Sequence, residues 1–332
     1  MTMATTETAR IPSAAMQRQR RANMRRNMFY LALIVIGLVA PFLAYPVFLM
    51  KILCFALFAC SFNLLLGYAG LLSFGHAAFL ATGGYVTGYL LSSYPGITPE
   101  VGILIGTLAG VALGVVFGAL SIRRQGIYFA MVTLALAQLM FFFFIQAPFT
   151  GGEDGLHGVV RGHFLGFISL DDNLSMYYFV FAVFLIGFAI IQRTVHSPFG
   201  QVLKAIRENE PRAVSLGYNV DAYKLLAFVI SAGLAGLAGS TKTLVFQLAS
   251  LTDAHWHMSG EVILMTLLGG VGTLLGPIMG AGIVVSLQHL LAQSPLGNWV
   301  SVILGLIFVV CVLSFRSGIV GELAKSYRKN FK

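Results

Sequence analysis

Hydrophobic residues fall in long, nearly unbroken runs along this chain, and short polar segments separate the runs. A helix rises 1.5 Å per residue, so roughly 20 apolar residues cross the hydrocarbon core of a bilayer. Eight runs approach or exceed that length: 29–47, 50–68, 76–93, 99–121, 126–147, 176–192, 224–247 and 297–315. This pattern predicts an all-α, polytopic membrane protein.

A ninth apolar stretch, 260–292, is long for one span and too short for two ordinary spans joined by a loop. Glycine and proline, which weaken or break helices, interrupt it at Gly269, Gly270, Gly272, Gly276 and Pro277. We therefore expect two short or tilted helices that meet at this break. The total becomes about ten transmembrane or half-membrane helices.

The composition agrees with a membrane protein and excludes most soluble classes. Of the 332 residues, 58% are hydrophobic and only 10% are charged, whereas soluble domains carry about 25% charged residues. The net charge of +9 does not indicate nucleic-acid binding, because Lys and Arg stand at the ends of apolar runs. The three cysteines have neither metal-ligand nor disulfide spacing. The function is therefore expected in transport or in intramembrane chemistry.

The distribution of basic residues predicts the orientation in the membrane. With ten crossings and an internal N-terminus, all 21 Lys and Arg residues except Lys51, Arg161 and Lys242 fall in internal segments. The external segments hold acidic residues instead: Glu100, Glu153, Asp154, Asp171, Asp172 and Asp253. The positive-inside rule thus predicts cytoplasmic termini, and the even number of crossings that this requires favours dividing 260–292.

The expected layout is a basic cytoplasmic tail over 1–28, a transmembrane domain over 29–315 and a basic cytoplasmic tail over 316–332. An external loop covers 148–175 and a cytoplasmic loop covers 193–223. The basic start could also be the charged end of a signal peptide. An uncleaved first span is favoured, because no small-x-small cleavage site follows cleanly.

The cytoplasmic loop carries the clearest local signals. Phe199, Val202, Leu203 and Ile206 have the i, i+3, i+4, i+7 spacing of a short amphipathic helix. Asn209-Glu210-Pro211 then favours a stop and a new helix start, and Gly217 is a typical helix-ending residue. Two short helices at an angle could dock another protein or rest on lipid headgroups. The spacing alone favours neither.

Three segments resemble a known family. Arg207 to Gly217, followed by Lys224 to Phe228, resembles the coupling loop of ABC importer permeases. Gly67 to Phe79 and Gly269 to Pro277 resemble Gly-rich blocks of the branched-chain amino-acid permease family, in the branch with the LivM-type subunit. The resemblance covers roughly residues 29–322. One departure is Pro211-Arg212-Ala213, where such loops often carry Glu-Ala-Ala.

The resemblance implies a heteromeric importer in the bacterial inner (plasma) membrane. Its other parts would be a second, homologous permease subunit, two cytoplasmic ATP-binding subunits and an external substrate-binding protein. The chain has no Gly-x-x-x-x-Gly-Lys-Ser/Thr loop, so it is expected to be no enzyme, to hold no cofactor and to leave ATP to the partner subunits. The implied coupling residues are Phe199, Val202, Ile206, Arg207, Glu208, Glu210, Arg212, Ala213 and Gly217. Branched-chain or related hydrophobic amino acids are the implied substrate, and urea or short amides are the alternative.

The Gly-rich blocks are the candidates for a substrate pathway. Glycine in a span lets helices pack closely, or it marks a break whose free backbone groups line a pathway. Both readings remain open. The pathway candidates are Gly67, Gly70, Ser73, Gly75, His76, Gly269, Gly270, Gly272 and Thr273.

Isolated ionisable residues in apolar segments bear on the remaining alternatives. Lys242 either lies at membrane depth or reaches an interface, and Glu261 is expected at the outer interface. His255 and His257 are expected as interface residues rather than a metal pair, so no metal is predicted. An ion-coupled carrier would need buried acids, but Asp and Glu stand almost wholly in loops. An intramembrane enzyme would need a Ser-His-acid set or a His-Glu-x-x-His helix, and neither occurs.

Overall fold

The computed structural model describes residues 32–94, 96–164, 166–294, 299–314, 318, 319 and 321. The predicted tail 1–28 lies outside these residues, as does most of the tail 316–332. The chain forms two compact units, 1–45 and 46–332. The described part of the first unit is the helix Ala32–Phe42, whose last turn is the 3-10 helix η1 (Ala40–Phe42). The predicted run 29–47 therefore ends early, because Pro46 already begins the next helix.

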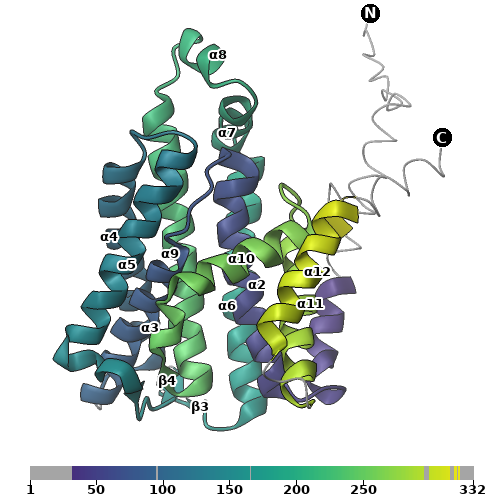
Figure 1. The fold of residues 1–332 in the computed structure, drawn as a ribbon. Helices are drawn as coiled ribbons and strands as arrows, with labels where there is room; N and C mark the ends of the chain where they lie inside the picture. The colour runs from purple at the N-terminus through teal and green to yellow at the C-terminus, as the bar shows by residue number, and fades with distance from the viewer. Residues whose placement is uncertain are drawn as a thin grey trace, which may run out of the picture. The chain divides into compact units, whose positions relative to one another are not determined.

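The second unit is a bundle of long helices (Figure 1). Their bounds are α2 Pro46–Asn63, α3 His76–Ser93, α4 Pro99–Ser121, α5 Ile127–Gln146, α6 Asn173–His196, α9 Val220–Phe246, α10 Trp256–Gly269, α11 Gly276–Ala292 and α12 Val300–Ser314. A π-helical turn, η2 (Leu64–Ala69), continues α2. Within the described residues, five helices are long and apolar enough to cross a membrane: α2 with η2, α4, α5, α6 and α9. The chain is a multi-pass helical membrane protein.

The two ends of the bundle differ (Figure 1). The short helices α7 (Pro198–Glu208) and α8 (Glu210–Ser215) project at one end. At the other end lie 3-10 turns and short strands: η3 Pro148–Thr150, η4 Gly152–Asp154, η5 Leu251–Asp253, β1 Leu156–His157, β2 His163–Phe164, β3 Ile168–Ser169 and β4 Leu248–Ala249. β1 pairs antiparallel with β4, and β2 with β3. The all-α prediction thus needs a small correction, because these strands satisfy backbone groups in the loops.

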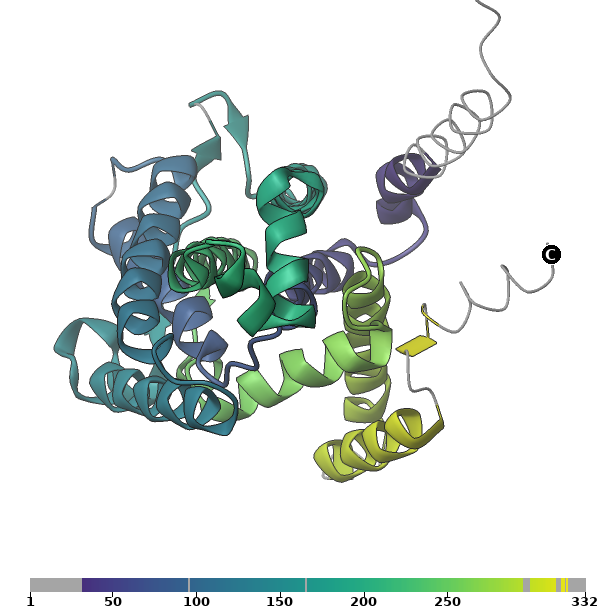
Figure 2. The same cartoon turned by 90° about the horizontal axis from the view of Figure 1, so that it is seen from above.

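Helix α9 lies in the middle of the bundle and packs against α2, α3 and α4 (Figure 2). Glycines of both α3 and α9 make this close approach possible, since a methyl group on Gly83 of α3 would overlap the carbonyl of Gly236 in α9. A methyl group on Gly239 would likewise overlap the carbonyl of Leu80 in α3. Helix packing is therefore the structural role of these glycines.

Two breaks interrupt the helices. The division of 260–292 is confirmed, because α10 ends at Gly269 and α11 begins at Gly276. Between them Gly270 and Gly272 have φ of 123° and 76°, a region that favours glycine. The first break follows η2, where Gly70 has φ of 74° and an irregular segment leads to α3.

Candidate functional site

Helix α7 forms where the apolar spacing predicts it. The Ser197 hydroxyl accepts a hydrogen bond from the Gly200 N–H at 3.3 Å, which caps the start of the helix. Leu203 and Ile206 are buried, and Phe199 stacks on Tyr223 of α9 with ring centroids 5.5 Å apart. The apolar stripe therefore holds α7 against the bundle rather than leaving it free.

Helix α8 begins and ends at the expected residues. The Asn209 side-chain oxygen accepts from the Arg212 N–H at 3.1 Å and caps the start. At the end the Gly217 N–H donates to the Val214 carbonyl at 2.9 Å, and the Tyr218 N–H donates to the Ala213 carbonyl at 3.2 Å. With φ of 85° at Gly217, this is a Schellman motif. The loop thus holds a defined shape.

A small apolar core joins α7, α8 and α9. Ile206, Ala213 and Val220 are buried together, with Val202 and Tyr223 packed against them. The neighbouring residues are exposed: Glu208, Arg212, Val214 and Leu216. Val214 and Leu216 are large apolar side chains that are 57% and 69% exposed. The outer face of α8 therefore offers mixed charged and apolar groups to its surroundings.

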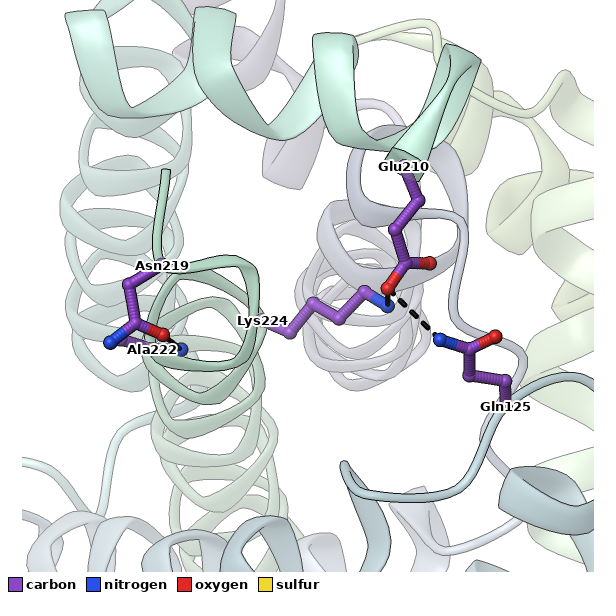
Figure 3. Close-up of polar contacts among 5 residues, drawn as sticks. All are labelled: Gln125, Glu210, Asn219, Ala222 and Lys224. Atoms are coloured by element: carbon purple, nitrogen blue, oxygen red, sulfur yellow. Dashed lines mark hydrogen bonds and ion pairs between the residues drawn. The ribbon is translucent and has the colours of Figure 1, made fainter. Parts of the chain in front are cut away.

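A partly buried ion pair fixes α8 to α9 (Figure 3). The Lys224 Nζ lies 2.6 Å from the Glu210 Oε1, and the Lys224 side chain is only 5% exposed. Gln125, in the turn between α4 and α5, donates its amide to the same Glu210 oxygen at 3.1 Å. Asn219 caps α9 through the Ala222 N–H at 3.2 Å. One carboxylate oxygen thus holds three segments together.

Arg207 connects α7 to the first break. Its guanidinium donates to the Gly67 carbonyl in η2, where the π-helical turn departs from regular α-helical pairing. A cavity of about 160 Å³ beside this contact is lined by Gly70, Arg207, Glu210 and Lys224, among others. The predicted coupling residues and the first Gly-rich block are therefore in direct contact.

Asn63 connects the first break to the second. Its side-chain oxygen accepts from the Gly272 N–H at 2.9 Å, and its amide donates to the Thr273 carbonyl at 2.8 Å. A methyl group on Gly67 would overlap both the Asn63 amide and the Gly272 backbone. The Thr273 hydroxyl donates to the Gly270 carbonyl at 2.8 Å and accepts from the Gly276 N–H at 3.1 Å. The two Gly-rich blocks thus meet around one asparagine.

The other pathway candidates are enclosed in this conformation. His76 is fully buried, and its Nε2 lies 2.8 Å from the Ser231 hydroxyl, which donates to the Ser61 carbonyl at 2.6 Å. The Ser73 hydroxyl is also fully buried and accepts from the Gly75 N–H at 3.1 Å. A methyl group on Gly269 would overlap the Gly276 carbonyl. Their role in a pathway stays a prediction.

A second polar cluster lies at the opposite end of the bundle. Lys242 forms an ion pair with Asp253, and both side chains are largely buried. Lys242 is therefore neither an isolated charge nor a freely exposed one. The Nδ1 of His257 lies 3.6 Å from the Glu261 carboxylate, and His255 caps α10 by accepting from the His257 N–H at 3.3 Å. Among the described residues, no three His, Cys, Asp or Glu side chains gather in a metal-binding group.

Sequence reasoning missed several polar contacts of this site. Asn63 and Gln125 were not singled out. Lys224 was noted as a basic residue and as the start of a segment in the family resemblance, without a partner. Asn63 carried a usable signal, because a lone amide within an apolar span must find hydrogen-bond partners. Its partners could not be known, since Thr273 lies 210 residues away.

The sequence of this chain matches a known protein family and several of its members. The family described as branched-chain amino acid transport system / permease component matches residues 45–312. The high-affinity branched-chain amino acid transport system permease protein LivM of Salmonella typhimurium is 25% identical over 297 residues, which cover 81% of this chain and 69% of that protein. The probable LivM permease protein of Methanocaldococcus jannaschii is 25% identical over 258 residues, or 66% of this chain and 73% of that protein.

A related permease type also matches. The LivH permease protein of Escherichia coli is 22% identical over 286 residues, which cover 81% of this chain and 91% of that protein. No solved structure matches this chain. The family match covers α2 to α11, most of α12 and both breaks. The chain therefore belongs to the permease-component family of branched-chain amino acid transport systems.

Proposed function

We propose that this chain is a permease subunit of an ABC importer that moves branched-chain or related hydrophobic amino acids into the cell. It would pair with a second, homologous permease subunit in the bacterial plasma membrane, with both termini cytoplasmic and about ten crossings. Two ATP-binding subunits would hydrolyse ATP on the cytoplasmic side, and an external binding protein would deliver the substrate. The named relatives are branched-chain amino acid permeases, which supports this assignment.

The observation that carries the proposal is the contact between α7 and the first membrane break. The exposed face of α8 gives an ATPase both charged and apolar groups to bind. Behind that face, Glu210 holds Lys224 and Arg207 holds the Gly67 carbonyl. A push on α7 and α8 would therefore act directly on α9 and on η2. An ATPase subunit that drives transport would need such a connection between the helices it binds and the helices in the membrane.

Subunit composition is the first test. The tagged chain is recovered from its own membranes in mild detergent, and the co-purifying proteins are identified by mass spectrometry. Two ATPases and a second permease are expected. Recovery of the chain alone, with transport intact after reconstitution, would contradict the importer. Uptake that ignores ATP depletion but collapses with an ionophore would instead support an ion-coupled carrier.

A loop variant tests the coupling role itself. Gly217→Pro forces φ to about −65° where the native φ is 85°, and it removes the N–H that donates to Val214. The complex is expected to assemble and to lose ATP-driven uptake. Gly217→Asn is the control, because asparagine tolerates the left-handed region. Full uptake by an intact Gly217→Pro complex would show that this loop does not couple.

A further inference from the structure

A cavity opens at the end of the bundle opposite to α7 and α8. Its volume is about 880 Å³, and residues from α2, α5, α9, α10, α11 and η5 line it. Small-molecule sites occupy roughly 300–1,000 Å³, so one small substrate fits with room for water. None of the pathway residues predicted from the sequence lines this cavity, so it is a separate feature.

Two cations and three carboxylates line the cavity: Lys51, Lys242, Glu153, Asp253 and Glu261. Of these side chains, only Glu153 is exposed. Lys242 and Asp253 already neutralise each other, and the Lys242 ammonium also lies 5.3 Å from the centre of the Phe55 ring. This pair forms a fixed, neutral part of the wall. Beside the exposed Glu153, it leaves Lys51 and Glu261 as the partly buried charges that a ligand could engage.

Lys51 and Glu261 are poorly satisfied within the described residues. No described residue forms an ion pair or hydrogen bond with Lys51, although the charges of Lys242, Glu261 and Asp253 act on it. Glu261 meets only His257, at 3.6 Å, and the Glu261 side chain is 17% exposed. Partly buried charges are costly unless paired. A ligand that carries one charge of each sign would satisfy both.

The remaining wall is apolar on one part and polar on another, where Ser250, Thr252, His255 and Gln288 line it. Phe55, Phe141, Phe246 and Met258 line the same cavity. An aliphatic side chain placed against these rings would be removed from water, which contributes about 25 cal/mol per Å² of buried apolar surface. The cavity therefore combines opposite charges with an aromatic wall.

We propose that this cavity binds an amino acid in its zwitterionic form, with the carboxylate on Lys51, the ammonium on Glu261 and an aliphatic side chain against Phe55 and Phe141. The proposal rests on the importer function and names the substrate class of that importer. Urea carries no charge and no apolar group, so it would form no ion pair with Lys51 or Glu261 and would leave the aromatic wall uncovered. Lys242 and Asp253 pair with each other on the polar side of the site, so Lys51 and Glu261 stay available to the ligand.

The test is equilibrium binding of radiolabelled leucine to the purified complex in nanodiscs, without the binding protein. A lost charge-assisted contact weakens binding about tenfold or more, so Lys51→Gln and Glu261→Gln are each expected to do so. Lys51→Arg is expected to retain binding. Arg193→Gln is the control, because Arg193 is an exposed cation in the last turn of α6 and does not line the cavity. Each variant must elute with its full set of subunits.

Competition identifies the chemistry that the site reads. Leucinamide lacks the carboxylate, 4-methylpentanoate lacks the ammonium, and urea lacks both charge and apolar surface. All three are expected to compete more weakly than leucine. Three results would each overturn the assignment. The variants Lys51→Gln and Glu261→Gln could bind leucine as tightly as the wild-type complex, or urea could compete as well as leucine. The third result is that the wild-type complex binds no leucine at millimolar concentration.

The two proposals fail in different ways. ATP-dependent leucine uptake by the wild-type complex in proteoliposomes, with the binding protein at saturation, tests the importer alone. If that uptake occurs and the two charge-removing variants bind and transport leucine normally, only the cavity assignment is wrong. If the wild-type complex shows no ATP-dependent uptake, the importer function itself fails.

Discussion

Replacing the partners of the Glu210–Lys224 ion pair one at a time is expected to give unequal losses of stability. The two atoms are 2.6 Å apart, and the side chains are 29% and 5% exposed respectively. At that distance and an effective dielectric constant of about 20, two unit charges attract by about 6 kcal/mol. Most of this attraction offsets the cost of removing the Lys224 ammonium from water.

The difference in exposure sets the direction of the inequality. Glu210→Leu leaves a nearly buried ammonium without its carboxylate, which costs about 3–5 kcal/mol of unfolding free energy. Lys224→Met leaves a partly exposed carboxylate that water and the Gln125 amide still solvate, so the loss is about 1 kcal/mol. The double variant replaces both charges by apolar groups and is expected to lie within about 1–2 kcal/mol of the wild type.

Unfolding of the detergent-solubilised chain in mixed SDS micelles, followed by circular dichroism, gives the free energies for the double-mutant cycle. The expected interaction energy between the two sites exceeds about 2 kcal/mol. Equal losses from the two single variants, or losses that simply add in the double variant, would refute the reasoning. The same variants in the whole complex should transport fewer amino acids per ATP hydrolysed, because only the apolar core of Ile206, Ala213 and Val220 then holds α8 on α9.

Three further predictions follow from other contacts. Asn63→Leu should cost about 2–4 kcal/mol in the same unfolding assay, because it removes two hydrogen bonds and leaves the Gly272 N–H and the Thr273 carbonyl unpaired; a loss below about 0.5 kcal/mol would contradict this. Gly83→Ala should destabilise the chain through overlap with Gly236, whereas Gly282→Ala, where a methyl group meets nothing within 4 Å, should be neutral or stabilising. Arg207→Met should lower uptake per ATP, with Arg207→Lys intermediate because one donor can still reach the Gly67 carbonyl.

The features predicted well from the sequence are those with local causes. The break between α10 and α11 follows from glycines and a proline in adjacent turns. The start of α8 at Asn209 and its end before Gly217 follow from capping chemistry that spans a few residues. Helix bounds were less accurate where a cap lay outside the apolar run. Helix α6 begins at Asn173 rather than 176, since the Asp172 carboxylate accepts from the Ser175 N–H.

The contacts of the site could not be predicted, because they join distant parts of the chain. Arg207 and Gly67 are 140 residues apart, and one sequence gives no measure of which helices are neighbours. Lys242 shows the same limit. From its position in an apolar run, one cannot tell whether its ammonium reaches an interface. It pairs with Asp253 because the chain turns back after α9 and brings η5 beside the end of that helix. Hydropathy identifies spans, but the partner of a polar group within a span depends on packing.

Two helices connect the end of the bundle that carries α7 and α8 to the charged cavity. Helix α2 carries Lys51 near its start and Asn63 at its end, about 18 Å apart along the axis. Helix α9 carries Lys224 in its second turn and Lys242 near its end, about 27 Å apart. Because α9 packs on α3 through backbone contacts at Gly236 and Gly239, little side-chain flexibility is available to absorb a shift. If a partner protein displaces the loop in the proposed transport cycle, we expect the shift of Lys224 to pass along α9 and to alter the cavity at the Lys242–Asp253 pair.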